Sequence, residues 1–429
     1  MLSNILKNTG FFKFILKEKS VVLSYVFYLF TNSLSIILPL VVTPILIRNY
    51  NLENYGIMML HQAIALFLSF LLDNGFRLYY IRLITINVEN HDKVTDIFFT
   101  FIKIKLFLSF FLTLLYITYI NFFVSQQFIF IAYSSILILI GNLLSPSFFL
   151  IGIDKFNLVS IINLFSRLFY LALFFCVVYF DKHNNYLNNL YLGLSYLFGS
   201  IVSYIIILKF YNINIFFFKK SNFNYLSIKE SIPLVVNNIF QNIDVYIHTF
   251  IIGFLVSNSN LGIFIAIEKF YSIFKQAIIA LIEIYYPKIC GQIKLNISDA
   301  IDRLKRLIKF LNIFFIIVFI SVFILKTYLS QFITNNSGIL AQNLIILFMI
   351  VPFAIINFNF KSHLLIMALG YDNKIANISF YSVILKSFLL CILFYFFNLY
   401  GIIIGLIIIE IFVGKMKSHI INLSNKNSN

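Results

Sequence analysis

Long apolar runs follow one another along almost the whole of this chain. The first two lie between Tyr28 and Arg82 and are joined only by the short polar turn from Arg48 to Gly56. A helix of about 20 apolar residues is long enough to cross the hydrocarbon core of a bilayer. The chain is 61% hydrophobic and 11% charged, whereas ordinary soluble domains are nearer half apolar and a quarter charged. The sequence therefore predicts a polytopic, all-α integral membrane protein.

The apolar runs divide into about twelve predicted spans. The first, Val21–Ile47, follows a basic stretch, but it is too long for the apolar core of a cleaved signal peptide, so we expect a true span there. The predicted spans are Val21–Ile47, Gly56–Thr85, Ile97–Ile120, Phe128–Ile151, Leu158–Phe180, Tyr186–Leu208, Ile232–Phe254, Leu261–Tyr286, Leu307–Lys326, Ile339–Leu369, Ile375–Phe397 and Gly401–Met416.

The basic residues indicate how these spans are oriented. The net charge is +16, yet most Lys and Arg residues lie in short loops on one side of the spans. Loops on the other side hold only Arg48, Lys182 and Lys326. Cytoplasmic loops carry the basic excess in membrane proteins. We therefore expect a multi-pass membrane protein with both termini cytoplasmic and no nucleic-acid partner.

The two halves of the chain resemble each other. Tyr55-Gly56-Ile57 opens the second span, and Leu261-Gly262-Ile263 opens the eighth. Copies with an even number of spans have the same orientation, so the axis relating them lies along the membrane normal. We expect two six-helix lobes, residues 1–208 and 232–429, joined by a cytoplasmic linker at 209–231 and enclosing a central cavity.

Charged residues inside the spans are candidates for function. A charge at the centre of a lone inserted helix costs about 2.5–3.5 kcal/mol, so most should face the protein interior. In the seventh span the polar residues Asn237, Gln241, Asp244 and His248 share one helical face. In the eighth, Lys269, Gln276 and Glu283 recur every seven residues. The first two spans of each half carry the polar stripes and are expected to line the cavity.

Two groups of candidates follow. Those expected to contact an anionic substrate are Lys269, Arg167, Lys361, Arg77, Lys275, Asn237, Gln241 and Gln276. Those expected to bind a coupling ion are Asp244, Asp73, Glu268 and Glu283. A purely structural role stays open for some of them, because Asp73 and Arg77 are one helical turn apart and polar stripes also hold helices together.

Motifs of soluble catalysis are absent from the sequence. It has no GxxxxGK[ST], GxSxG, HExxH or CxxC pattern. Cys176, Cys290 and Cys391 are far apart and do not have metal-ligand spacing. We therefore expect neither an enzyme nor a metal or cofactor site, and no ATP bound by this chain.

Short motifs along the chain identify a family resemblance. They are Asn32 with Pro39 and Pro44, Ile47-Arg48, Glu53-Asn54-Tyr55-Gly56, Asp73-Asn74-Gly75-Phe76 with Arg82, Gly152-Ile153-Asp154-Lys155, Pro233 with Gly253, Leu261 to Lys269, Pro287-Lys288, Leu369-Gly370, and Gly401 through Gly405 to Glu410. In this order and spacing the chain resembles the Wzx-type O-antigen flippases of the multidrug/oligosaccharidyl-lipid/polysaccharide exporter (MOP) superfamily.

The resemblance implies a MATE-like pseudo-twofold bundle of twelve helices. It also implies a flippase of the bacterial inner membrane that carries an undecaprenyl-pyrophosphate-linked glycan to the outer leaflet by alternating access. The implied partners are membrane lipids and the polymerase and chain-length regulator of the same pathway. No cofactor is implied, with H⁺ or Na⁺ as the candidate coupling ion. The chain departs from a strongly cationic cavity, since bases inside its spans outnumber acids only six to five. The alternatives are a cation-coupled multidrug exporter and, less favoured, a polysaccharide polymerase.

Overall fold

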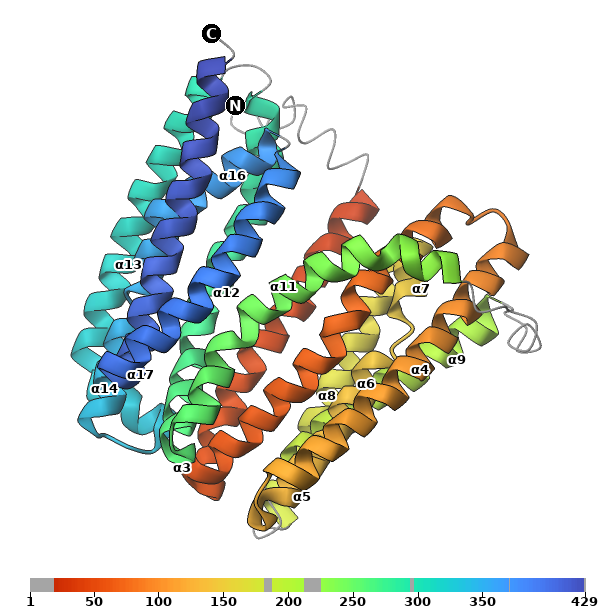
Figure 1. Cartoon of the computed structure of the whole chain (residues 1–429), viewed down its shortest axis with the longest axis horizontal. Coiled ribbons are helices and arrows are strands. Elements are labelled where there is room, and N and C mark those ends of the chain that lie inside the picture. Colours follow the sequence, from red (N-terminus) through yellow and green to blue (C-terminus); the bar gives the residue numbers. More distant parts are fainter. Residues whose placement is uncertain (1–18, 181–186, 212–224, 294–296, 370, 428–429) are drawn as a thin grey trace, which may run out of the picture. The chain divides into compact units, whose positions relative to one another are not determined.

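The computed structural model describes residues 19–180, 187–211, 225–293, 297–369 and 371–427. Within these ranges the chain is helical and contains no β-strand (Figure 1). This agrees with the predicted all-α class. The predictions made for the remaining residues, such as Lys182, lie outside the described part of the chain.

The first half of the chain forms long helices with one interrupted stretch. The elements are α3 (Lys19–Ile86), α4 (His91–Phe123), the 3₁₀ turn η1 (Gln126–Phe128), α5 (Ile129–Ser134), α6 (Ile136–Leu143), α7 (Ser147–Gly152), α8 (Phe156–Phe180) and α9 (Asn188–Phe210). The pieces from η1 to α7 together occupy the predicted fourth span.

The second half repeats this pattern of long helices. Its elements are α11 (Tyr225–Leu255), α12 (Asn258–Ile293), α13 (Ile297–Thr334), α14 (Ile339–Phe348), α15 (Val351–Ala354), the π-helical η3 (Ile355–Phe360), α16 (Lys361–Ala368) and α17 (Asp372–Asn427). The predicted tenth span is likewise built from several short pieces, α14 to α16.

Two of the long helices contain a sharp break. In α3, Asn51 has φ 63° and ψ 162°, and in α17, Asn398 has φ 50° and ψ −137°. Asparagine tolerates positive φ better than most residues because its short amide can bond to nearby backbone. Both breaks lie in connections that the sequence predicts, the first between Arg48 and Gly56 and the second just before Gly401.

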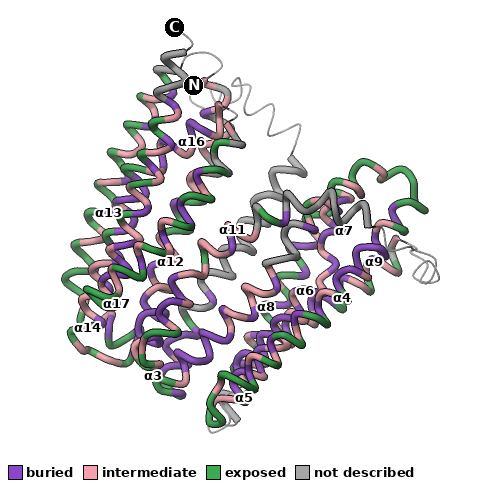
Figure 2. The backbone as a smooth tube through the Cα atoms, viewed as in Figure 1, coloured by how far each residue is buried: buried purple, intermediate pink, exposed green. Residues whose placement is uncertain are grey.

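Seven helical stretches of the described chain are long and apolar enough to cross a membrane. They are His91–Phe123, Gln126–Gly152, Phe156–Cys176, Asn188–Lys209, Asp299–Thr334, Ile339–Ala368 and Asn377–Ile421. The multi-pass character is thus confirmed, while the count of twelve spans stays a prediction. Only 17% of the most apolar window of Asp299–Thr334 is buried, and α13 shows long exposed faces (Figure 2). Exposed apolar surface of this extent is suited to lipid.

Contacts group the chain into two compact units. One consists of Met1–Leu38 and Leu68–Val235, and the other of Pro39–Phe67 and Val236–Asn429. The first two predicted spans form a hairpin, and residues 39–67 are its tip. This tip packs with the second half of the sequence. The expected boundaries at 208 and 232 stay a prediction, and much of the linker at 209–231 lies outside the described residues.

Each unit has an aromatic core between its helices. In the first unit Tyr80 stacks on Phe101 with ring centroids 4.2 Å apart, and Phe101 meets Phe148 edge to face at 4.6 Å. In the second unit Phe348 of α14 lies 5.1 Å from Phe264 and 5.2 Å from Tyr271, both on α12. Aromatic contacts at these distances stabilise beyond the area that they bury.

Candidate functional site

The helical stretch formed by α6 and α7 is interrupted at Pro146. Proline has no N–H to donate, so carbonyl groups in the preceding turn need other partners. The Tyr204 hydroxyl donates to the carbonyl oxygen of Leu144 at 2.9 Å, and Lys105 Nζ donates to that of Ser145 at 2.7 Å. Two side chains from α9 and α4 thus stabilise a break inside an apolar stretch.

A polar cavity of about 310 Å³ lies in the first unit beside this break. Helices α3, α6, α7, α8 and α9 contribute to its lining. The polar lining residues are Arg77, Asn142, Ser145, Ser147, Asn163, Ser166, Arg167, Tyr196, Ser200 and Ser203. The cavity therefore offers two guanidinium groups together with amide and hydroxyl groups.

Several of the small polar residues hold the walls of this cavity in place. Asn142 Nδ2 donates to Ser69 Oγ at 3.1 Å, which joins α6 to α3. Ser200 Oγ donates to the Gly141 carbonyl at 2.8 Å, which joins α9 to α6. Ser166 Oγ donates to the Ser195 carbonyl and joins α8 to α9. Hydrogen bonds of this kind fix the helices around a site that apolar packing alone would not specify.

The two arginines of the cavity come from different helices. Arg167 of α8 donates from Nη2 to the Tyr196 hydroxyl at 3.3 Å, and its Cζ lies 5.1 Å from the centre of that ring. Arg77 of α3 has a buried Nε that makes no hydrogen bond to any residue in the described ranges. Among the described residues no carboxylate lines the cavity. The lining that the structure describes is therefore positively charged.

Asp244 and Glu268 of the second unit have basic partners. Lys386 Nζ lies 3.1 Å from Asp244 Oδ1 and also donates to the Asp244 carbonyl at 2.5 Å. His248 Nε2 lies 2.6 Å from Glu268 Oε1. Two of the predicted ion-coupling residues, Asp244 and Glu268, are thus held in pairs between α11 and α17 and between α11 and α12.

Lys269, the next residue on α12, contacts the tip of the first hairpin. Its ammonium donates to Met59 Sδ at 2.7 Å and lies 5.6 Å from the centre of the Tyr55 ring. The Tyr55 hydroxyl is in turn 3.3 Å from Thr43 Oγ1. Lys269 is not a lining residue of the cavity in the first unit or of the smaller cavity described next.

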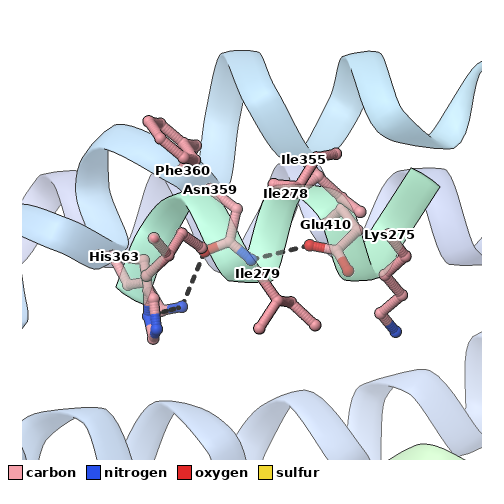
Figure 3. Close-up of a pocket in the computed structure, with 10 residues that line it drawn as sticks. Lys275, Ile278, Ile279, Ile355, Asn359, Phe360, His363 and Glu410 are labelled. Carbon is pink, nitrogen blue, oxygen red and sulfur yellow. Dashed lines mark hydrogen bonds between the residues drawn. The ribbon is translucent and has the colours of Figure 1, made fainter. Parts of the chain in front are cut away.

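A smaller cavity of about 160 Å³ lies within the second unit (Figure 3). Lys275 of α12 lines it together with Asn359, His363, Glu410 and Lys417. Asn359 donates to Glu410 Oε2 at 2.8 Å and accepts from Lys417 Nζ at 2.8 Å. The same lysine lies 3.0 Å from His363 Nδ1. This polar network connects η3, α16 and α17.

The remaining predicted residues lie elsewhere or outside the described part. Lys361 begins α16, is near Asp302 and Lys305 of α13, and lines neither cavity. Gln276 is exposed on α12. The side chains of Asp73, Asn237, Gln241 and Glu283 are outside the described residues.

Sequence reasoning missed two buried lysines. Lys105 and Lys417 are not among the candidate residues, yet their side chains are only 1% and 6% exposed. Lys105 lies eight residues inside the predicted third span, so its position in an apolar run was the available signal. Lys417 directly follows the predicted end of the last span, and no sequence signal distinguishes it from a flanking base.

The chain is similar in sequence to known proteins. Residues 22–290 match the family model described as "Polysaccharide biosynthesis protein". A stretch of 144 residues is 31% identical to the "Putative O-antigen transporter" of Escherichia coli (strain K12). That match covers 33% of this chain and about a third, 34%, of the length of the relative.

Solved structures resemble the fold along almost its full length. An inward-facing multidrug resistance MATE family transporter of the MOP superfamily aligns with a TM-score of 0.66 and 12% identity, covering 93% of this chain and 96% of that one. A mutant MATE transporter of Vibrio cholerae aligns with a TM-score of 0.59 and 12% identity, covering 95% of each chain. At these identities the likeness shows the fold alone.

The long apolar helices and the MATE-type fold define a multi-pass membrane protein. Within that class, the chain belongs to the polysaccharide biosynthesis protein family, because the family model matches more than half of the length of the chain.

Proposed function

We propose that the chain is a flippase for an undecaprenyl-pyrophosphate-linked oligosaccharide, an O-antigen or capsule repeat unit. It moves the lipid-linked unit from the cytoplasmic to the outer leaflet of the inner membrane by alternating access. It is a transporter and not an enzyme, and both termini are cytoplasmic. The polymerase and chain-length regulator of the same pathway are its proposed partners, alongside the membrane lipids.

The observation that carries this proposal is the cavity that Arg77 and Arg167 share. A guanidinium is planar and presents its donors in a fork that matches phosphate oxygens, and such charge-assisted bonds are about twice as strong as neutral ones. Placing two arginines at one cavity inside a membrane protein is costly unless negative charge meets them. A pyrophosphate entering the cavity supplies that charge, and its binding offsets the cost.

The rest of the lining suits the sugar. Serine hydroxyls and the Asn142 and Asn163 amides offer donors and acceptors to sugar hydroxyls, and Tyr196 adds an aromatic ring. A cavity with two bases and no described carboxylate disfavours a cationic drug as cargo. Lys269, Lys275 and Lys361, together with Asn237, Gln241 and Gln276, remain proposed contacts at other stages of transport.

The test uses cells that lack this gene but retain the remainder of a surface-polysaccharide pathway. Lipid-linked repeat units are extracted after treatment with a glycan-oxidising probe that cannot cross the membrane. We expect completed units to stay on the cytoplasmic face until the gene is restored. Normal outward display with new sensitivity to cationic dyes would instead indicate a drug exporter, and outward display without polymerisation would indicate a polymerase.

Variants then test the cavity itself. Restoring the gene as Arg77→Ala, Arg167→Ala or the double variant should leave protein in the membrane but reduce outward display, most in the double. Arg306→Ala is the matched control, because this exposed arginine of α13 lies outside both cavities. Full display with the double variant would refute the assignment of the cavity while leaving the flippase function open.

A further inference from the structure

A row of polar side chains lies on the second unit where α13 packs against η3 and α16. On α13, Lys305, Lys309 and Asn312 follow one another at intervals of four and three residues and therefore share one helical face. On the facing segment, Asn357 and Lys361 are one turn apart. We call these five residues the amide–lysine stripe.

Two links connect the helices along this stripe. Asn312 Nδ2 donates to Asn357 Oδ1 at 2.8 Å, and Asn357 Nδ2 donates to Asn312 Oδ1 at 3.0 Å. Two turns nearer the start of α13, Lys305 lies within electrostatic reach of Lys361. Because seven residues separate Lys305 from Asn312, the amide pair lies about 10 Å further along the helix axis than the lysine.

The lysines of the stripe outnumber the acids that meet them. Lys305 Nζ forms an exposed ion pair with Asp302 Oδ1 at 2.9 Å. Lys309 and the half-buried Lys361 make no ion pair with a residue that the structure describes. Like charges that lie close together repel each other, and an anion between them removes that cost. The stripe therefore has positive charge that a bound anion would balance.

The amide pair also has a donor left over. Asn357 Nδ2 uses both of its hydrogens, because it donates to Asn312 Oδ1 and to the Phe353 carbonyl at 2.9 Å. Asn312 Nδ2 uses one hydrogen, and the other has no acceptor among the residues that the structure describes. An amide that keeps a donor at an apolar surface gains from an acceptor that is not water.

The stripe runs from the end of a span toward the hydrocarbon. Lys305 and Lys361 lie about two turns inside the ends of the apolar stretches Asp299–Thr334 and Ile339–Ala368. By the distribution of basic residues these are the cytoplasmic ends. Beyond Asn312 the same face of α13 is apolar and exposed, at Ile313, Ile316 and Ile320. Exposed apolar surface of this kind suits lipid chains.

From this arrangement we propose that the amide–lysine stripe binds one anionic diacyl phospholipid of the cytoplasmic leaflet. The phosphate lies between Lys305 and Lys361, and Lys309 adds positive charge beside it. An ester carbonyl below the phosphate accepts the remaining hydrogen of Asn312, and the acyl chains cover the exposed isoleucines. Basic pockets between helices on this side of a membrane are suited to anionic headgroups.

The ester carbonyl distinguishes this ligand from other lipid phosphates. A polyprenyl phosphate, the kind of lipid in the proposed substrate, has hydrocarbon where a diacyl phospholipid has its carbonyl oxygens, so it offers no acceptor to Asn312. Lys361 was expected to contact an anionic substrate, and a phospholipid phosphate presents the same oxygens to it. The site is independent of the proposed flippase function.

The first experiment measures lipid preference beside the stripe. The chain has no tryptophan, so Ile316→Trp, one turn beyond Asn312, introduces a single fluorescent reporter. The full-length variant is placed in phosphatidylcholine bilayers that contain brominated phosphatidylglycerol or, for comparison, brominated phosphatidylcholine, since bromine quenches tryptophan at close range. We expect phosphatidylglycerol to quench at lower mole fractions than phosphatidylcholine.

Charge variants in the same background identify the residues responsible. Lys305→Gln and Lys361→Gln should each lower the preference for phosphatidylglycerol about 5-fold. Lys326→Gln removes the same charge from the other end of α13 and should leave the preference unchanged. Equal quenching by the two brominated lipids, or an equal loss in Lys326→Gln, would overturn the inference.

The second experiment tests the ester contact by competition. Unbrominated diacyl phosphatidylglycerol should restore the fluorescence about 2- to 12-fold more effectively than its ether-linked analogue, which has no carbonyl oxygens. Asn312→Leu should remove that difference. Equal competition by the two lipids before this substitution would refute the diacyl assignment. Undecaprenyl phosphate that competes as well as the diacyl lipid would overturn it in favour of the transported lipid. Neither readout requires transport, so failure here leaves the flippase proposal standing.

Discussion

Gly56 and Gly262 face each other at a helix crossing in the second unit. A Cβ added to Gly56 would lie 2.9 Å from the Gly262 nitrogen, and one added to Gly262 would lie 3.3 Å from the Gly56 nitrogen. The same two glycines occupy matching places in the sequence repeat, in Tyr55-Gly56-Ile57 and Leu261-Gly262-Ile263. Positions that resemble each other in sequence thus meet in the fold, where the start of α12 packs on the tip of the first hairpin.

This contact predicts that Gly56→Ala destabilises the protein. The added methyl group would overlap the carbonyl oxygen of Asn258, a backbone atom that cannot move aside alone. Overpacking of this kind costs about 1–3 kcal/mol. The apparent melting temperature of the purified protein should fall, whereas Gly338→Ala, which meets only the movable side chain of Asn336, should change it little. Equal melting temperatures for both variants would contradict the close approach.

The Arg167–Tyr196 contact predicts different effects for two substitutions of the tyrosine. Tyr196→Phe removes the hydroxyl that accepts the guanidinium but keeps the ring, so outward display of the glycan should drop only slightly. Tyr196→Leu removes the ring as well, and a lost cation–π contact of about 0.5–2 kcal/mol corresponds to a decrease of about 2- to 30-fold. The rate of outward display in restored cells measures both. If the two variants behaved alike, the ring would have no part in holding Arg167.

Lys105 is predicted to stabilise the break at Pro146. Its ammonium bonds to the Ser145 carbonyl and lies 4.9 Å and 5.3 Å from the centres of the Phe101 and Phe148 rings. Lys105→Met keeps the length of the side chain but leaves that carbonyl without its donor, which costs about 1–3 kcal/mol.

Thermal unfolding of Lys105→Met should therefore begin at a lower temperature than that of the wild type. Lys93→Met, at an exposed position on the same helix, is the control and should unfold like the wild type. A Lys105→Met protein that is as stable as the control would contradict the prediction.

The Asp244–Lys386 pair is predicted to be a structural contact whose partners depend on each other. The side chain of Lys386 is 7% exposed and that of Asp244 is 44% exposed. The acidic partner is therefore only half-buried, and breaking the pair should cost about 1–2 kcal/mol, below the range for fully buried pairs.

A double-mutant cycle tests this dependence. Asp244→Asn should lower both the melting temperature and glycan display, and adding Lys386→Met should restore part of each, because the stranded ammonium is gone. If Asp244 bound the coupling ion, the double variant would regain stability but no display, and the pair would then be functional.

The sequence identified several residues of the candidate site, but it did not indicate how they are arranged in space. Arg77 and Arg167 were singled out because charge inside an apolar span needs a reason. Nothing in the sequence indicated that both would line one cavity, since they belong to different helices. The cavity also draws on α6 to α9, whereas polar stripes had pointed to the first two spans of each half. Serine in a membrane helix often bonds only to backbone, so its position alone is a weak signal.

By itself the sequence determined the membrane class, the helical fold and the places where α3 and α17 break, because apolar run length and turn-forming residues act locally along the chain. Only the tertiary structure decided which charges are paired. It joined Asp244 to Lys386, Glu410 through Asn359 to Lys417, and Lys105 to the carbonyl of Ser145. The reason is physical: helical periodicity gives the face on which a side chain lies, but its partner depends on which helix packs against that face and at what register.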